Sequence, residues 1–367
     1  MNNDIKKVLL KLERNGFEAY IVGGFVRDYL LGNQSLDIDI CTNALPKDII
    51  KVFKIKKGIT NYGSISLKYG KYNIDITTYR TESNYEKHHP KNIEYVNNLL
   101  TDLERRDFTI NAICMNSDGK IFDFYDGKQD LDKKLIQVIG DTKTKLSEDP
   151  LRMLRAIRFS SVLNFKLDKE IENFIINNRE LINTISFDRK KIELDKILAS
   201  KNSLIGLEMI KKYDLFDVLG IKYDTIVFVP DLIGLWAQID FNKNYNFNKT
   251  MLDNIKSIRK IIKKGIIDSE VLLKYDLYIC LVAGLILGYP KEEVNKMYKD
   301  LPIHKTSDLK ISNKDIMKLL NIDGSPKVKE VYNDILNKVL NKKLKNNKRI
   351  IKKYIVKNWM WKIWIIF

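Results

Sequence analysis

The fold is decided by the stretch YIVGGFVRD at residues 20–28 and the segment LDIDI that follows it at residues 36–40. The first segment predicts a strand, a two-glycine turn and the start of a helix, and the second predicts another strand. Side chains at alternate positions of a strand point to one face, so Asp37 and Asp39 are expected to converge. Two neighbouring carboxylates suit a hard divalent cation such as Mg²⁺.

The glycine turn complements these carboxylates. Gly23 and Gly24 are expected to let backbone N–H groups approach a phosphate, with a helix N-terminus and Arg27 behind them. Each motif alone has a structural alternative, since Gly-Gly before a helix is commonly a tight turn and LDIDI can be a half-buried strand with a solvated acidic face. The occurrence of glycines, an arginine and an Asp pair within one short span favours a site for a nucleotide and magnesium.

The composition is that of a soluble protein with more than one domain, with 367 residues, 44% hydrophobic and 30% charged. The formal net charge of +17 indicates a polyanionic partner, although lysine is abundant throughout the chain and accounts for part of this charge. Cys41, Cys114 and Cys280 are too far apart for a disulfide framework or a metal motif, which predicts a reducing, cytoplasmic compartment. The longest apolar run, around residues 278–287, is too short to span a bilayer, so no membrane association is expected.

The segments after this stretch, and the one before it, predict regular elements. Helices are expected at residues 4–15 and from 45–50 onward, and strands are expected at 64–69 and at 72–78. Asp75, on the second of these strands, is a candidate third carboxylate beside the Asp pair, and a solvated strand position is the alternative. Residues 80–100 are polar and poorly periodic, so they predict a long mobile loop.

Two further motifs combine charge with apolar residues. DLERRDFTINA, residues 102–112, is an acid–base cluster that runs into an expected apolar helix, and simple charge patterning is the alternative. SEDPLRMLRAIRF, residues 147–159, predicts a helix with Pro150 in its first position and Asp149 as its cap. Three arginines recur at every third residue along this helix and form a basic stripe: Arg152, Arg155 and Arg158. A surface helix with ion pairs between neighbouring turns is the alternative.

Two other features concern partners. The segment 337–357 is rich in Lys and Arg between apolar residues, so a basic helical face that suits an RNA backbone is expected, and a solvated charge run is the alternative. Only three histidines occur in the chain, which excludes a His-rich, metal-dependent phosphohydrolase domain.

In this order, GGFVRD, LDIDI, RRDFTINA and EDPLRMLR, followed by an amphipathic helix at residues 186–198, resemble the motifs of the bacterial-type (class II) CCA tRNA nucleotidyltransferase and poly(A) polymerase family. The resemblance implies an α+β nucleotidyltransferase head, which is a small mixed β-sheet flanked by helices, followed by all-α neck, body and tail domains. The domains are expected at residues 1–140 (head), 141–200 (neck with the base-selecting helix) and 201–367 (body and tail, which bind tRNA).

The resemblance also assigns roles to individual residues. Asp37 and Asp39 are expected to be the catalytic metal ligands, with Mg²⁺ as the cofactor and Asp75 in support. The nucleotide is expected to contact the glycine turn and a set of arginines and aspartates: Gly23, Gly24, Arg27, Arg106, Asp107, Asp149, Arg152, Arg155 and Arg158. Within this set, Arg106 and Asp107 are assigned to the ribose hydroxyls and the phosphates of the incoming nucleotide.

The pattern Glu148-Asp149-x-x-Arg152 is similar to the family's protein template for choosing C and A. The Asp149 carboxylate would accept from the exocyclic amine of cytosine or adenine, and Arg152 would donate to the ring acceptor beside that amine. Uracil and guanine present a carbonyl in place of the amine and would leave the carboxylate unpaired, which predicts strong discrimination. Glu148 is expected to orient Arg152, and Arg155 and Arg158 are expected to bind the triphosphate or to hold the helix in place.

The implied function is the addition of C, C and A to the tRNA 3′ end from CTP and ATP, without a nucleic-acid template and with release of pyrophosphate. Poly(A) polymerases share the head motifs, and an enzyme that adds only C residues is a second alternative. In the resembled family, a flexible loop at the position of residues 80–100 helps to switch from C to A, so its presence favours full CCA addition. An RNA-binding protein that has lost catalysis is a third alternative, against which the intact site residues argue. The enzyme is expected to be a monomer or a homodimer.

Overall fold

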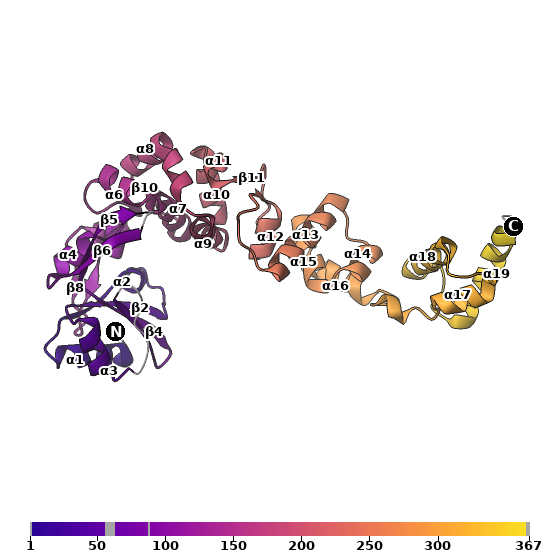
Figure 1. The fold of residues 1–367 in the computed structure, drawn as a ribbon, viewed down its shortest axis with the longest axis horizontal. Coiled ribbons are helices and arrows are strands. Elements are labelled where there is room, and N and C mark those ends of the chain that lie inside the picture. Colours follow the sequence, from indigo (N-terminus) through magenta and orange to yellow (C-terminus); the bar gives the residue numbers. More distant parts are fainter. Residues whose placement is uncertain (1, 56–62, 87–88, 365–367) are drawn as a thin grey trace. The chain divides into compact units, whose positions relative to one another are not determined.

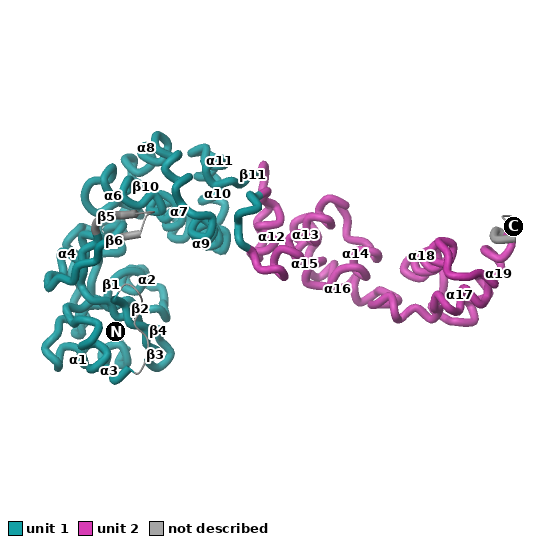
Figure 2. The backbone as a smooth tube through the Cα atoms, viewed as in Figure 1, with its two compact units in different colours: residues 1–222, 241–246 teal, residues 223–240, 247–367 magenta. Residues whose placement is uncertain are grey.

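The computed structural model describes residues 2–55, 63–86 and 89–364 (Figure 1). The chain divides into two compact units, Met1–Lys222 with Phe241–Asn246 and Tyr223–Asp240 with Phe247–Phe367 (Figure 2). The first unit contains a β-sheet with helices around it, and the second is built from helices.

A six-stranded mixed sheet forms the first part of unit 1, in the strand order β3–β4–β2–β1–β7–β8. Its strands are β1 (Ala19–Val22), β2 (Asp37–Thr42), β3 (Ser64–Tyr69), β4 (Tyr72–Thr78), β7 (Cys114–Met115) and β8 (Ile121–Phe122). Strands β2 and β4 run parallel, and the other neighbours run antiparallel. In β2, the buried Ile38 and Ile40 alternate with the exposed Asp37 and Asp39, so the predicted convergence of the two carboxylates on one face is confirmed.

Three helices accompany the N-terminal strands: α1 (Asn3–Glu13), α2 (Gly24–Leu30) and α3 (Pro46–Phe53). Helix α1 buries the four apolar residues that predicted it: Ile5, Val8, Leu9 and Leu12. Each such side chain contributes roughly 1.5–3 kcal/mol of hydrophobic stabilisation. Pro46 lies in the first turn of α3, where its missing N–H leaves no hydrogen bond unmade.

The prediction of a loop at residues 80–100 is wrong in secondary structure, because the described part of that segment forms regular elements. It contains strand β5 (Arg80–Glu86), strand β6 (His89–Tyr95) and helix α4 (Leu99–Glu104). Strands β5 and β6 pair in an antiparallel hairpin, whose residues 87 and 88 lie outside the described residues. The pairing uses backbone groups, which polar residues supply as well as apolar ones, so the sequence lacks the alternation that predicts a strand.

The acid–base motif at residues 102–112 does not continue into an apolar helix, contrary to the sequence prediction. It begins in α4, passes through the 3₁₀ helix η1 (Thr109–Asn111) and leads to β7. Phe108 between them is extended, with φ −126° and ψ 146°, and pairs with Val138. Phe108 and Ile110 are fully buried by tertiary packing, which overrides the local helical pattern.

Helices dominate the rest of unit 1. They are α5 (Gly127–Lys133), α6 (Thr142–Glu148), α7 (Leu151–Leu163), α8 (Lys169–Asn178), α9 (Phe187–Leu198), α10 (Ser203–Lys212) and α11 (Phe216–Leu219), with the 3₁₀ helix η2 (Arg179–Thr184) and the short strands β9 (Leu135–Ile136), β10 (Lys166–Leu167) and β11 (Ile221–Lys222). Helix α7 packs against α9 and α10. The helix predicted at residues 186–198 is confirmed as α9.

The start of α7 differs by one residue from the prediction. Pro150 is its N-cap, and Asp149 precedes it. Asp149 nevertheless has a capping contact, because its Oδ1 accepts a hydrogen bond from the Leu151 N–H at 3.2 Å. The carboxylate is therefore fixed at the positive end of the helix.

Unit 2 confirms the expected helical continuation. Its helices are α12 (Leu232–Ala237), α13 (Lys249–Lys264), α14 (Ser269–Lys274), α15 (Leu277–Ile286), α16 (Lys291–Lys299), α17 (Asn313–Leu320), α18 (Pro326–Leu340) and α19 (Lys348–Trp364), with the 3₁₀ helix η3 (Thr306–Asp308) and one residue of the short strand β12 (Asp240–Phe241). The basic segment 337–357 falls on two helices, because α18 ends at Leu340 and α19 begins at Lys348. In the described part of the chain, no helix is both long and apolar enough to cross a membrane.

The three cysteines are all buried and free of disulfides. Cys41 lies on β2, Cys114 on β7 and Cys280 in α15. Burial raises the pKa of the Cys280 thiol to about 12, so this thiol is protonated at neutral pH.

Candidate functional site

A cleft of about 780 Å³ in unit 1 gathers most of the predicted site. Its walls include every residue predicted to bind the nucleotide: Gly23, Gly24, Arg27, Arg106, Asp107, Asp149, Arg152, Arg155 and Arg158. Asp39 lines it too, whereas Asp37, Asp75 and Glu148 lie outside the lining. Eight cationic side chains face three carboxylates around the cleft, and this excess of positive charge favours a polyphosphate ligand.

Six polar or aromatic residues of the cleft were not predicted from the sequence: Arg105, Asn111, Phe159, Arg189, Lys196 and Ser200. Arg105 and Asn111 belong to the motif at residues 102–112 that the sequence analysis identified. Their closeness in sequence to Arg106 and Asp107 could therefore have indicated that they belong to the site. Arg189 and Lys196 lie on α9, of which the sequence indicated only that it is an amphipathic helix.

Gly23 occupies a position where a side chain would not fit. Its φ is +79°, and a Cβ atom built on it would lie 3.2 Å from Asp39 Oδ2 and 3.8 Å from Arg106 Nη1. A backbone with positive φ strains any residue with a side chain, and here the Asp39 carboxylate would also have to shift. The glycine turn therefore brings backbone into the wall of the cleft beside the Asp39 carboxylate.

Three carboxylates form the acidic part of the site. Asp37 and Asp39 are exposed on β2, and Asp75 is the direct partner of Asp39 across the parallel pair of β2 and β4. Desolvation raises the pKa of Asp39; Arg106 opposes this rise, and the charges of Asp75 and Asp37 add to it. A bound divalent cation would relieve the repulsion among the three groups.

The donor set fits a magnesium ion that shares its ligands with a substrate. Asn73 Nδ2 donates to Asp37 Oδ1 at 2.9 Å and Ser66 Oγ donates to Asp75 Oδ1 at 2.5 Å, so neighbours orient both carboxylates. Over residues 2–55, 63–86 and 89–364, three or more His, Cys, Asp or Glu side chains nowhere converge on a complete metal centre. Mg²⁺ is usually held by one or two carboxylates together with phosphate oxygens and water, and two Asp residues on one strand satisfy that pattern.

Arg106 is held by a fully buried carboxylate, Asp102 of α4. Asp102 pairs with Arg106 Nη2 at 3.2 Å and with Arg105 Nη2 at 2.8 Å, and it also accepts from the Arg80 N–H at 3.2 Å. Burial alone would lower the pKa of Arg106, but the charges of Asp102, Asp39 and other neighbours together outweigh burial, and the pKa is raised. Arg105 also reaches Glu82 of β5 at 3.1 Å, so this ion-pair network joins the β5–β6 hairpin to the wall of the cleft.

Replacing Asp102 by Ala is expected to lower the free energy of unfolding by about 3–5 kcal/mol, because the buried counter-ion shared by Arg105 and Arg106 is lost. Urea denaturation followed by circular dichroism would measure the loss. The exposed Asp132 of the same unit provides the matched control, Asp132→Ala, which should change stability by no more than about 0.5 kcal/mol. Equal stabilities for the two variants would contradict a structural role for Asp102.

The Asp107 carboxylate is fully engaged by protein groups. Oδ1 accepts from the Phe108 N–H at 2.9 Å and from Asn111 Nδ2 at 3.2 Å, and Oδ2 accepts from Arg155 Nε at 2.7 Å and from Arg155 Nη2. Burial would raise its pKa, but the Arg155 charge and these hydrogen bonds outweigh burial and lower the pKa to about 2. Since a carboxylate oxygen has two lone pairs, these four bonds occupy the acceptors that a ribose hydroxyl would need.

Asp149 and Arg152 both line the cleft, as the motif that contains them predicted. Arg152 Nη1 donates to the Lys145 carbonyl at 2.8 Å, and Nη2 donates to the Arg105 carbonyl at 3.3 Å. The expected contact with Glu148 exists, at 3.5 Å, but the two carbonyl contacts are shorter. Asp149 Oδ2 pairs with Arg189 of α9 at 3.5 Å. Helix α9 thus steadies the carboxylate that is predicted to read the base.

The other two arginines of the stripe contact different partners. Arg155 binds Asp107, whereas Arg158 pairs with the buried Glu193 of α9 at 3.2 Å and lies 4.1 Å above the Phe159 ring. Burial lowers the pKa of Arg158 to about 10 despite the charge of Glu193. Of the two roles predicted for Arg158, these contacts favour the one of holding α7 in place.

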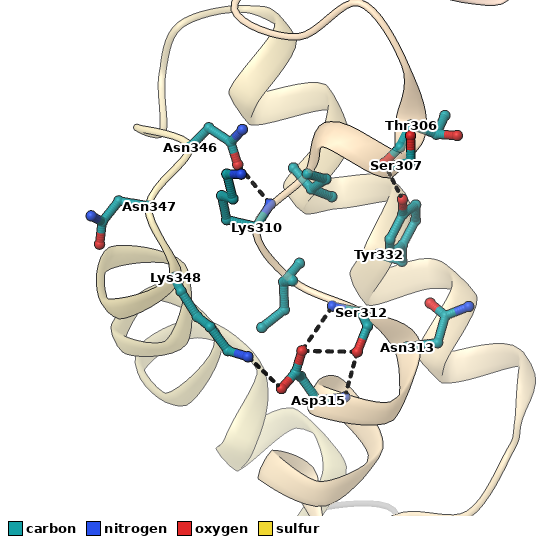
Figure 3. A pocket seen from close by; sticks show the side chains of 12 residues that line it. Thr306, Ser307, Lys310, Ser312, Asn313, Asp315, Tyr332, Asn346, Asn347 and Lys348 are labelled. Carbon is teal, nitrogen blue, oxygen red and sulfur yellow. Dashed lines mark hydrogen bonds and ion pairs between the residues drawn. The ribbon is translucent and has the colours of Figure 1, made fainter.

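Unit 2 contains a second hollow, of about 720 Å³, where η3 and the segments that begin α17 and α19 meet (Figure 3). Asp315 accepts from Ser312 Oγ at 2.8 Å and pairs with Lys348 at 3.0 Å, and Asn346 Oδ1 accepts from the Lys310 N–H at 2.8 Å. These bonds link α17 to the start of α19. The lining has two cationic side chains where the cleft of unit 1 has eight, so the cleft is the stronger candidate for a polyanion.

Family models match three parts of the chain. Residues 19–137 match the poly A polymerase head domain, which covers the sheet and the glycine turn. Residues 164–221 match a region of polymerase A described as an RNA- and SrmB-binding site, and residues 281–355 match domain 2 of tRNA nucleotidyltransferase.

Individual relatives match over nearly their whole length. A CCA-adding enzyme of Lactobacillus johnsonii is 34% identical, with 96% of each chain covered, and one of a Geobacillus species is 30% identical, with 95% of each chain covered. The crystal structure of the Bacillus stearothermophilus CCA-adding enzyme in complex with CTP is 26% identical and has a TM-score of 0.81, covering 97% of this chain and 98% of that one. The Thermotoga maritima CCA-adding enzyme complexed with tRNA has a TM-score of 0.70 at 21% identity and shares the fold, over 97% and 96% of the two chains.

Proposed function

Because the chain belongs to the CCA-adding enzyme family of nucleotidyltransferases, we infer that it adds C, C and A to tRNA 3′ ends from CTP and ATP and releases pyrophosphate. The observation that carries this function is the cleft itself. One cavity is lined by the glycine turn, by Asp39 of β2 and by both Asp149 and Arg152. Transfer of a selected nucleotide requires these three parts: a phosphate-binding site, a metal-binding site and residues that recognise the base.

The phosphates are bound by the basic wall of the cleft. Arg27, Arg106 and Arg155 supply the charges, and the backbone at Gly23 and Gly24 allows close approach. Guanidinium groups match phosphate oxygens in geometry and charge. For Asp107 we propose support of Arg155 in place of the expected ribose contact, because its oxygens already accept four hydrogen bonds from protein.

Asp37 and Asp39 would hold Mg²⁺, with Asp75 as an electrostatic neighbour. Bound Mg²⁺ lowers the pKa of the attacking hydroxyl and neutralises charge on the leaving pyrophosphate. The two carboxylates are fixed by the strand itself, since the alternation in β2 sets both on one face. The chain's own contribution to the in-line displacement at the α-phosphate is to position the triphosphate against these carboxylates and to hold its charge.

The base is read at the start of α7. Asp149 accepts from the amine of cytosine or adenine and Arg152 donates to the neighbouring ring nitrogen, a pattern that uracil and guanine do not offer. Carbonyl contacts and Glu148 hold Arg152, and Arg189 holds Asp149. Asp149 and Arg152 therefore have limited conformational freedom before the nucleotide binds, which lowers the entropic cost of binding its base.

The RNA partner is a tRNA 3′ end, and the basic helices of unit 2 are proposed to contact its backbone. The formal charge of +17 and the lysines of α18 and α19 support this role. A cytoplasmic location agrees with three free, buried thiols.

The function is tested with tRNA transcripts that end before CCA, after C and after CC, beside a generic RNA. Each is incubated with Mg²⁺ and CTP, ATP or both, and the products are resolved to single nucleotides. We expect completion to CCA on every tRNA substrate and no extension of the generic RNA.

Other outcomes would assign another function. Long A tails on any RNA would identify a poly(A) polymerase, and extension that stops at CC would identify an enzyme that adds only C. Salt-sensitive tRNA binding without incorporation would identify an RNA-binding protein that has lost catalysis.

A further inference from the structure

We propose that Asn111 is a positioning residue for the triphosphate: it fixes Arg27 directly and Arg155 through Asp107. Arg27 Nη1 donates to Asn111 Oδ1 at 2.8 Å, and Asn111 Nδ2 donates to Asp107 Oδ1 at 3.2 Å. Asp107 in turn binds Arg155. The inference rests on the proposed nucleotide-binding function of the cleft and adds a residue that acts on the phosphates through other side chains.

The four side chains all line the cleft, and their hydrogen bonds connect α2 with α7. Arg27, Asp107 and Asn111 are each at most 8% exposed, so these polar groups depend on one another and not on water. Arg27, Arg155 and Arg158 all lie near the Phe159 ring, with guanidinium carbons 5.3, 5.6 and 4.1 Å from its centroid. Three guanidinium groups around one ring repel one another, and a polyphosphate between them would remove that repulsion.

Asn111 is itself held in a fixed place. It is the last residue of η1, and α5 presses on this turn so closely that a Cβ atom on Gly127 would lie 2.4 Å from the Thr109 carbonyl oxygen. Thr109 Oγ1 also donates to Asp130 of α5 at 2.5 Å. The amide of Asn111 therefore extends from a rigid turn, which suits a residue whose task is to set the direction of two arginines.

The chemistry of the amide explains why asparagine serves here. Its oxygen accepts from a guanidinium, and its nitrogen donates to a carboxylate. Aspartate at this position would keep the acceptor for Arg27 but would place a second carboxylate against Asp107. Alanine would release Arg27 to its contact with Asp28, whose Oδ1 lies 2.8 Å from Arg27 Nη2, and would leave Asp107 with one hydrogen bond fewer.

The test measures equilibrium binding of CTP, CMP and inorganic pyrophosphate to the full chain and to Asn111→Ala. We expect affinity for CTP and pyrophosphate to fall by about tenfold to 100-fold, which is the effect of losing one hydrogen bond to a charged group, and affinity for CMP to stay within about twofold. Asn116→Ala is the matched control, because Asn116 caps a turn of the same unit outside the cleft and should leave all three affinities unchanged.

Asn111→Asp gives a second measurement that does not depend on the alanine variant folding well. A protonated carboxyl donates a hydrogen bond and a carboxylate does not, so the deficit of this variant relative to wild type should shrink as the pH falls from about 8 to 5. Equal losses for CTP and CMP, or a deficit that does not change with pH, would overturn the positioning role. Failure of the wild-type chain to bind CTP or pyrophosphate would instead overturn the proposed function.

Discussion

Asp39→Asn is expected to abolish nucleotide transfer, with kcat lowered roughly 10³- to 10⁴-fold and the fold intact. The carboxylate is exposed on β2, so its loss removes the proposed metal ligand and no core contact. Losing several kcal/mol of transition-state charge stabilisation accounts for the size of the effect, since each 1.36 kcal/mol or so is tenfold in rate. The rate of extension of tRNA ending in CC with ATP, measured under single-turnover conditions, would report the change in the chemical step.

The controls for this prediction separate catalysis from folding and binding. Asp37→Asn should behave like Asp39→Asn, whereas Asp118→Asn, whose side chain is 79% exposed and outside the cleft, should keep wild-type activity. Affinity for CTP in the absence of metal should be preserved in Asp39→Asn, because the arginines and the proposed base-reading pair remain. Activity within about tenfold of wild type in either β2 variant would contradict the assignment of the metal ligands.

Asp149→Asn is expected to reduce the preference for CTP over UTP by about 100-fold, chiefly by making uracil acceptable. The NH₂ group of the asparagine side chain donates to the uracil O4, which a carboxylate repels. One hydrogen bond to a charged group is worth about 1.5–3 kcal/mol. Arg152 still opposes the uracil N3–H, so the preference should not vanish. The ratio of kcat/KM for CTP and UTP, measured in single-nucleotide extension, reports the effect.

Asparagine is also a good helix cap, so the hydrogen bond to the Leu151 N–H should survive and stability should change little. Asp188→Asn, an exposed carboxylate in the first turn of the facing α9, serves as the control and should leave the ratio unchanged. If Asp149→Asn lowered the rates with CTP and UTP equally, Asp149 would be a structural cap and not the reader of the base.

The parts of the site that the sequence predicted are those encoded within a few neighbouring residues. The alternation of LDIDI set two carboxylates on one face, as β2 shows. The Gly-Gly pair marked a turn that needs positive φ, as Gly23 adopts. The pattern at residues 148–152 predicted that Asp149 and Arg152 belong to the site, and both line the cleft. Local periodicity and backbone requirements suffice for such features.

The parts that the sequence did not predict depend on contacts between distant residues. The sequence around Arg27 does not indicate that Asn111 accepts a hydrogen bond from it. The motif RRDFTINA likewise does not show that the Asp107 oxygens accept hydrogen bonds from Arg155, Asn111 and the Phe108 N–H. The β5–β6 hairpin was not predicted because its strands are polar and pair through backbone hydrogen bonds. Hydrogen-bond satisfaction is a property of the folded chain, and a sequence pattern does not contain it.

The burial of all three thiols makes the natural chain a suitable starting point for fluorescence labelling. Maleimide dyes need an accessible thiolate, so at neutral pH they should react only with a cysteine that is introduced at the surface. Tyr95, 46% exposed on β6, and Lys299, exposed at the end of α16, offer one attachment point in each unit. A donor and an acceptor dye at these positions would report the separation of the two units in solution, nucleotide by nucleotide, while a single tRNA is extended.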